Sequence, residues 1–347
     1  MEQAVAVLLV LTTLLCVVLT SFTVVRKLRR DRHETLFAGR RARFGRLLLS
    51  HDPSELEQGL RRVVRARVTQ VDLLVVLEAL WPRLDEPQRE RIRAAVGASG
   101  LGAVLARQLR SRVAVRRATA ALLIGTVSLA GASEMLEPVV DDGDGDVRLV
   151  AVRALAAVAD RRAAEALIAT LATGRLEHER VIERLAARWA VPTILDVLAV
   201  EVGTPAVRAS LARALGLAGD QSAETALRAM LRSGEVEERV GAARALGTAG
   251  SPASAPDLEA ALVAPDWPLR VQAARSLGLL GAERAVPALA QRLGDPAWWV
   301  RSAAAEALAM LGQPGHAALR AALAGDDRFA SQRAQEALTV HALASGG

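Results

Sequence analysis

One fixed period governs the C-terminal half of this chain. Arginines recur at a constant spacing, a leucine follows each arginine seven residues later, and a glycine follows three of the four leucines directly. The three ladders are Arg208, Arg239, Arg270 and Arg301, then Leu215, Leu246, Leu277 and Leu308, then Gly216, Gly247 and Gly278, with Ala309 in the fourth glycine position. We call the step from Arg208 to Arg239 the repeat period. A fixed period of this length is the signature of a repeat architecture.

A second apolar pattern with the same period lies between the arginine segments. Its members are Leu227, Leu258 and Leu289, followed four residues later by Leu231, Leu262 and Leu293. Apolar residues at i and i+4 share one helix face, and Pro256 and Pro287 suit the first turn of a helix. Each repeat is therefore predicted to be a helix A, a Gly-x-x-Gly break and a helix B. Such pairs bury little surface alone, so we expect an all-α, right-handed α-solenoid of stacked pairs.

The same pattern continues toward the N-terminus in weaker form. Residues 115–128 and 147–160 fit helix A, and a shortened repeat between the clear ones carries Glu179 where arginine is expected. Helices predicted before residue 111 show no clear ladders; they cover residues 55–68, 71–83, 86–96 and 101–109. The predicted organisation is an anchor at 1–25, a basic segment at 26–50, degenerate helical repeats at 51–110, clear repeats at 111–326, and a capping helix, over 330–344, with its tail at 327–347.

Residues 4–25 are predicted to cross a membrane. This stretch has no charged residue and would span about 33 Å as a helix, which matches a hydrocarbon core of about 30 Å. Cleaved signal peptides begin with positive charge and have a shorter apolar region, whereas this N-terminus carries Glu2. We therefore expect one uncleaved N-terminal transmembrane helix.

Positive charge is concentrated directly after this predicted span. Residues 26–46 hold nine basic side chains against Asp31 and Glu34, and with Glu2 they account for the whole net charge of +6. Basic segments stay on the cytoplasmic side, so the repeats are predicted to be cytoplasmic, at the inner membrane, with the N-terminus outside. Residues 4–25 and the basic segment 26–46 are the predicted lipid contacts. The remaining, neutral part argues against nucleic-acid binding unless one face alone is basic.

The sequence offers no pattern for catalysis, a cofactor or a metal. Cys16 is the only cysteine and lies in the predicted span, and no two of the five histidines are spaced as a zinc pair. Asp142, Asp144 and Asp146 fit the first positions of a calcium loop, but the glycine and glutamate required later are replaced by Val147 and Arg153. We interpret these aspartates as caps of the following helix.

Three tryptophans are the predicted partner-binding residues. Trp267 and Trp298 occupy equivalent positions one repeat period apart, just before helix A, and Trp299 adjoins the second. Tryptophan is enriched among residues that dominate binding energy at protein interfaces. The competing interpretation is that each ring covers the end of a repeat interface.

From about residue 111 to 326 the chain resembles the HEAT repeat family, specifically the short bacterial HEAT-like type known from phycobilisome lyases. The resemblance rests on Val-Arg at 147–148 and 300–301 and on Ala-Leu-Gly at 214–216 and 245–247. It implies that the helix A arginines are structural and lie near acidic groups between repeats; they are Arg116, Arg148, Arg208, Arg239, Arg270 and Arg301.

The resemblance also implies a function, because HEAT arrays are mostly surfaces that bind proteins. We expect a membrane-anchored, non-catalytic scaffold or adaptor at the cytoplasmic face of a bacterial membrane, with a membrane-associated protein partner. Tethered bacterial versions resemble accessory subunits of envelope machines such as membrane glycosyltransferases. Two alternatives stay open: a HEAT-like enzyme of the lyase or glycosylase type, and a superhelix that binds nucleic acid.

Overall fold

The structure is a computed structural model that describes residues 38–65, 69–174, 178–200 and 202–345. Helices dominate these residues and no strand occurs among them, which confirms the all-α prediction. The chain divides into two compact units, residues 1–130 and 131–347. These units are defined by how densely the residues contact one another, whereas the boundary predicted after residue 110 marks where the repeat pattern in the sequence becomes clear.

The predicted membrane span, residues 4–25, lies outside the described residues, as does the basic segment up to residue 37. Within the part of the chain that the structure describes, no helix is both long and apolar enough to cross a bilayer. The anchor therefore stays a prediction from the sequence.

The first unit contains each of the four helices predicted before residue 111. They differ from prediction by a few residues at their ends, and a helical stretch over residues 38–49 precedes them. The elements are α2 (Pro53–Arg65), α3 (Thr69–Leu80), η1 (Trp81–Arg83), α4 (Glu86–Ala98), α5 (Leu101–Gln108) and α6 (Ala114–Val127). The start of α4 is fixed by Asp85, which accepts a hydrogen bond of 2.8 Å from the Gln88 amide while Gln88 Oε1 accepts one of 3.0 Å from the Asp85 amide.

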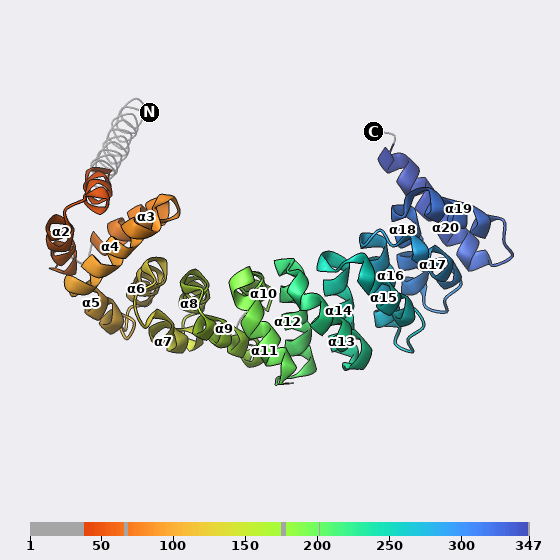
Figure 1. Cartoon of the computed structure of the whole chain (residues 1–347), viewed down its shortest axis with the longest axis horizontal. Helices are drawn as coiled ribbons and strands as arrows, with labels where there is room; N and C mark the ends of the chain where they lie inside the picture. Colours follow the sequence, from red (N-terminus) through yellow and green to blue (C-terminus); the bar gives the residue numbers. More distant parts are fainter. Residues whose placement is uncertain (1–37, 66–68, 175–177, 201, 346–347) are drawn as a thin grey trace, which may run out of the picture. The chain divides into compact units, whose positions relative to one another are not determined.

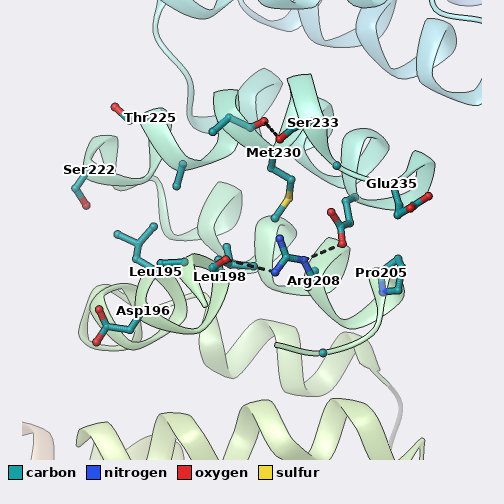
Figure 2. Close-up of a pocket in the computed structure, with 16 residues that line it drawn as sticks. Leu195, Asp196, Leu198, Pro205, Arg208, Ser222, Thr225, Met230, Ser233 and Glu235 are labelled. Atoms are coloured by element: carbon teal, nitrogen blue, oxygen red, sulfur yellow. Dashed lines mark hydrogen bonds and ion pairs between the residues drawn. The ribbon is translucent and has the colours of Figure 1, made fainter. Parts of the chain in front are cut away.

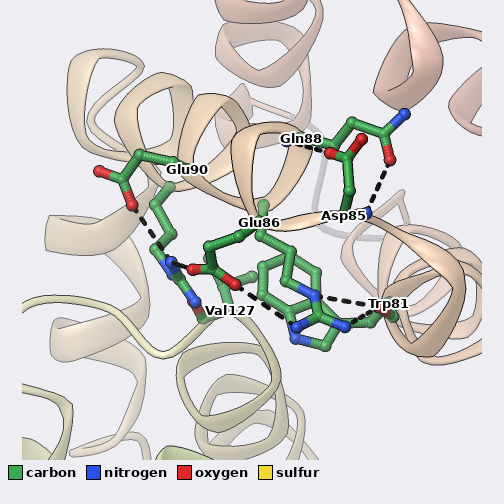
Figure 3. A network of polar contacts seen from close by, with 8 residues as sticks. Trp81, Asp85, Glu86, Gln88, Glu90 and Val127 are labelled. Carbon is green, nitrogen blue, oxygen red and sulfur yellow. Dashed lines mark hydrogen bonds and ion pairs between the residues drawn. The ribbon is translucent and has the colours of Figure 1, made fainter.

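A polar cluster beside Trp81 ties α4 to the end of α6 (Figure 3). Arg93 Nε donates a 3.1 Å hydrogen bond to the Val127 carbonyl, and its Nη1 donates to Glu86 and Glu90. Arg89 donates to the Trp81 carbonyl through Nε and Nη2. The guanidiniums of Arg89 and Arg93 lie 5.9 and 5.7 Å from the centre of the Trp81 ring. These contacts tie α4, which shows no repeated pattern, to α6, the helix of the first unit that fits the helix A pattern.

The second unit is a row of helix pairs, as the repeat period predicts. Its A helices are α8 (Gly145–Val158), α10 (His178–Leu185), α12 (Pro205–Ala218), α14 (Val236–Ala249), α16 (Trp267–Leu279) and α18 (Trp298–Met310). Its B helices are α7 (Ala132–Leu136, with η2 over Glu137–Asp141), α9 (Arg161–Thr173), α11 (Val191–Ala199), α13 (Glu224–Ser233), α15 (Ala255–Ala261), α17 (Val286–Arg292) and α19 (Gly312–Leu323). The helix α20 (Arg328–Ser345) closes the row and covers residues 330–344, where the capping helix was predicted. Figure 1 shows α12, α14, α16 and α18 side by side, and they pack on one another in order.

The leucine ladders form the core of this row. All four helix A leucines are fully buried, and the six helix B leucines expose at most 2% of their surface. Each therefore contributes roughly 1.5–3 kcal/mol through burial. The repeats have no central core; the buried layer runs from one helix pair to the next.

The glycine ladder permits the A helices to approach closely. A Cβ at Gly216 would lie 2.6 Å from the Ala245 Cα, and one at Gly278 would lie 2.9 Å from the Ala307 Cα. At Gly247 it would meet Ser276, whose Oγ donates to the Ala243 carbonyl across the same interface. The glycines therefore recur because each faces the backbone of the next A helix.

Three of the six ladder arginines bind carbonyls that follow helix B, and Arg208 and Arg239 bind carbonyls near its end. Arg148, Arg270 and Arg301 each donate through Nη1 to the carbonyl six residues earlier, at 2.8–2.9 Å. Arg117 does the same to the Ser111 carbonyl, so Arg117 and not the expected Arg116 holds this place in the register. Carbonyls beyond the end of a helix lack intrahelical donors, and a guanidinium supplies them.

Acidic partners between repeats occur at two rungs of the ladder. Arg270 forms a bidentate pair with Asp295 at 2.9 Å, and Arg208 Nε donates to Glu238 Oε1 at 2.8 Å. Burial raises the pKa of the Asp295 carboxyl, but hydrogen bonds from Arg270 and the Ala297 amide outweigh this effect and hold that pKa below its ordinary value. The expected acidic neighbours are thus confirmed at these two positions.

The shortened repeat is present, and Glu179, which stands where the pattern has arginine, forms an ion pair. α10 has only eight residues, and Glu179 pairs bidentately with Arg213 of α12. The loop DDGDGD also behaves as predicted: Asp144 accepts hydrogen bonds from the Asp146 and Val147 amides at the start of α8. This arrangement confirms the capping interpretation of that loop.

Candidate partner-binding surface

The three predicted tryptophans lie at the first turns of two neighbouring A helices. Trp267 is the first residue of α16, and Trp298 and Trp299 begin α18. Their exposed fractions are 47%, 44% and 55%. Since α16 packs directly on α18, the structure places the tryptophans on one edge of the second unit.

Two further residues belong to this edge. Phe329 lies one repeat period after Trp298, in the first turn of α20, and is 58% exposed. Val236 lies one repeat period before Trp267, begins α14 and is 37% exposed. The repeat period alone identifies both positions when residues are selected by their place in the repeat and not by being tryptophan. We call this set the apolar edge: Val236, Trp267, Trp298, Trp299 and Phe329.

Part of the apolar edge is engaged within the protein. The Trp298 and Trp299 rings meet edge to face, with centroids 4.5 Å apart, and the Arg333 guanidinium of α20 lies 5.4 Å from the Trp298 ring. Arg301 covers Phe329 at 4.8 Å. Trp298 therefore also covers a repeat interface, as the competing interpretation holds, while Trp267 makes no ring or cation contact among the described residues.

A cavity of about 800 Å³ opens beside the start of the same edge, between α11 and α13 (Figure 2). Arg208 lies at its base, where Nε donates to Glu238 and Nη1 donates to the Leu198 carbonyl at 3.3 Å. Met230 and Leu195 line its walls, together with other short apolar and hydroxyl side chains. No sequence pattern marked this cavity.

The exposed face of the B helices carries ion pairs between repeats. Arg228 and Arg232 of α13 both donate to Asp257 of α15, at 2.5 and 2.7 Å. Burial raises the pKa of Asp257, but these two arginines more than offset that effect and hold the pKa below its ordinary value. This face differs from the apolar edge, which presents rings instead of paired charges.

The described residues contain no cluster of three or more His, Cys, Asp or Glu side chains placed to hold a metal ion. Asp142 and Asp144 accept hydrogen bonds from backbone amides of their own loop. Cys16 lies outside the described residues.

A protein-family model described as HEAT repeats matches residues 191–270 and 255–339. These two matches span the regular pairs from α11 to α20. No curated protein matches the chain.

Several solved structures are similar to this chain in fold. Human deoxyhypusine hydroxylase in complex with glycerol shows 23% identity and a TM-score of 0.31, and the match covers 80% of this chain and 98% of that one. The complex of CpcE and CpcF of phycocyanin lyase from Nostoc sp. PCC7120 shows 22% identity and a TM-score of 0.33, with 69% and 94% covered. Importin beta shows 13% identity and a TM-score of 0.44, with 80% and 45% covered.

Proposed function

Because residues 191–339 are HEAT repeats, we propose that this chain is a membrane-anchored, non-catalytic scaffold that binds a protein partner through its apolar edge. The observation that carries the proposal is the row of exposed rings on consecutive A helices. HEAT repeats form helical arrays, and extended arrays of this kind use their surfaces for binding.

The apolar edge has the chemistry of an interface centre. Large aromatic side chains that are half exposed in the free protein gain apolar burial when a partner covers them. Tryptophan is enriched among the few residues that supply most of the binding energy. Trp267 and Trp299 are the strongest candidates in this set, because Trp298 is already in contact with Arg333.

The anchor belongs to the same proposal. Residues 4–25 would cross the inner membrane and the positive segment would keep the repeats in the cytoplasm. Arg40 Nε lies 2.9 Å from Asp72 Oδ2 and Arg41 Nε 3.6 Å from Asp72 Oδ1, so these two arginines pair with the buried Asp72 of α3. We therefore assign the lipid contacts of the predicted basic segment 26–46 to its other cations.

The kind of partner follows from this location. A tethered scaffold meets proteins that share its membrane, and a membrane glycosyltransferase complex is the partner that we would test first. We propose no catalytic role for the chain, since the scaffold role requires only the surface and the anchor.

The test is a comparison of captured proteins from solubilised membranes. Wild-type chain and the variants Trp267→Ala, Trp299→Ala and Phe329→Ala are expressed with a C-terminal tag, and recovered proteins are measured by quantitative mass spectrometry. We expect one or more membrane proteins to be recovered about tenfold less with each variant, as for residues at the centre of an interface.

Leu217→Ala and Leu279→Ala are the matched controls. Both leucines are about half exposed on A helices but lie away from the helix starts. They remove comparable apolar surface and should leave recovery unchanged. Equal recovery of every protein with the edge variants and the wild type, at equal helical content and equal membrane fraction, would overturn the proposal.

A further inference from the structure

The cavity between α11 and α13 adjoins the line of helix starts that carries the apolar edge. Pro205, which lines the cavity, is the first residue of α12 and lies one repeat period before Val236. Glu235, which also lines it, is the residue directly before α14. A segment bound along the apolar edge can therefore reach the cavity at its Val236 end.

The cavity lies beside the segment that joins α11 to α12, with Gly203 in its lining. Arg208 reaches back ten residues to the Leu198 carbonyl, whereas Arg239 reaches back eight residues and Arg270 and Arg301 reach back six. The cavity has a volume of about 800 Å³.

The lining of the cavity combines apolar side chains with carboxylate groups that can accept further hydrogen bonds. Glu238 is 6% exposed; its Oε1 accepts from Arg208, and its Oε2 has no donor among the described residues and lies near Gly234 of the lining. Glu235 forms no ion pair among those residues and is exposed, whereas Asp196 is paired with Arg161 at 2.8 Å. After these pairings the lining retains one net negative charge, carried by Glu235.

We propose that this cavity receives an arginine or lysine side chain of the protein partner. The apolar walls, with Leu195 and Met230, suit the methylene stem of such a side chain, and Glu235 with Glu238 Oε2 suits its charged end. An anionic group is disfavoured, because the one guanidinium in the lining is already paired with Glu238. This inference rests on the proposed scaffold function and names the chemistry of its partner.

The spacing of the A helices adds a requirement on the partner sequence. Packed helices lie about 8–10 Å apart, and an extended chain advances about 3.3 Å per residue. In a partner segment bound along the edge, the basic residue should therefore lie roughly three residues from the partner residue that contacts Val236. It should lie roughly six residues from the partner residue that contacts Trp267.

The probe for the test is a fluorescein-labelled nona-arginine peptide, added to the full-length chain in detergent and followed by fluorescence anisotropy. We expect saturable binding that weakens about tenfold in Glu235→Lys, which reverses the free charge, and in Ala229→Phe, which fills the cavity without changing charge. Ala229 is an exposed residue of α13 in the lining.

Each variant has a matched control. Ala260→Phe adds the same ring at the equivalent exposed position of the next repeat, on α15, and Glu283→Lys reverses an exposed charge away from the cavity. These controls should change the dissociation constant less than twofold. A nona-glutamate peptide should not bind.

The outcomes separate the two proposals. Equal binding of nona-arginine by Glu235→Lys, Ala229→Phe and the wild type, no binding at all, or binding of nona-glutamate would overturn the cavity proposal. The scaffold proposal is judged separately by the tryptophan variants, which should lose their partner and still bind nona-arginine as the wild type does.

Discussion

The first unit and the regular repeats of the second unit are both helical, yet they are held together in different ways. Between α12 and α18 the same contacts recur once in every repeat period: a buried leucine, a glycine against the next A helix, and an arginine near the end of helix B. The first unit relies on contacts that occur once, such as the hydrogen bond from Arg93 to the Val127 carbonyl.

This difference predicts how the effect of a substitution on stability should depend on the region in which it is made. In the repeats a substitution disturbs one interface of a type that occurs several times, so its effect can be compared with that at equivalent positions. In α2 to α5 of the first unit, which precede the repeat register, no equivalent position was found. Matched substitutions in the two regions therefore test whether the difference holds.

Arg270→Ala should cause the largest loss of stability. It leaves Asp295, which is 4% exposed, without its bidentate partner, and breaking a buried pair in this way costs about 3–5 kcal/mol. Arg239→Ala removes a hydrogen bond to the Leu231 carbonyl and should cost only about 1 kcal/mol. Urea unfolding followed by circular dichroism measures both.

Equal destabilisation by these two changes would show that the ion pair with Asp295 does not make Arg270 contribute more to stability than Arg239. The repeated arginine contacts would then not differ in strength where an acidic partner is present. Arg270→Gln is a useful third variant, because its amide nitrogen takes the place of the arginine Nε that faces Asp295 Oδ2 and so offers a donor there without the charge.

Much of the repeat architecture was predictable, because one period repeats both the sequence and its contacts. The leucine and glycine ladders indicated which residues are buried and where helices approach. Arg116 was assigned because it follows Val115 in the Val-Arg pattern, although Arg117 lies one repeat period before Arg148 and makes the hydrogen bond. Phe329 was missed because the prediction followed tryptophan instead of the position in the repeat.

Other features depend on geometry that no period encodes. The cavity beside Arg208 is lined by side chains of α11, α12, α13 and α14 that the repeat period does not single out. The helices of the first unit were predicted from their apolar patterns, but the cluster around Trp81 joins residues from α4 and α6 that are 34 positions apart. Contacts that occur once leave no ladder in a sequence.

Gly247→Ala should destabilise the second unit by about 1–3 kcal/mol through overpacking. The added Cβ would lie 2.5 Å from Ser276 Oγ and 2.8 Å from the Ser276 Cα, so α14 and α16 must move apart. The loss of stability is measured by thermal unfolding, and Gly247→Ala combined with Ser276→Gly should recover part of it. No recovery in the double variant would locate the strain elsewhere.

Asp257→Asn tests the charged pairs between B helices through pH. The pKa of Asp257 lies below its ordinary value in the folded protein, so its ionised form stabilises the fold above about pH 4, and this contribution is lost as pH falls through the folded pKa. The variant should be less stable than wild type by about 1 kcal/mol near pH 7. The difference should shrink toward pH 2, as measured by urea midpoints across this range. A difference independent of pH would mean that the carboxylate acts through its shape and not its charge.

Gly97→Ala should have the smallest effect and the opposite sign. Gly97 lies inside α4 of the first unit, and a Cβ there would have no neighbour within 4 Å, in contrast to Gly247. Alanine lowers the entropy of the unfolded chain and favours helix, so we expect a gain of about 0.5–1 kcal/mol. The unfolding midpoint of the full chain measures the change if the first unit limits it, and hydrogen exchange at the α4 amides measures it directly. Destabilisation at this position would show that a glycine outside the ladder is also required by packing, and the distinction between the two regions would have to be redrawn.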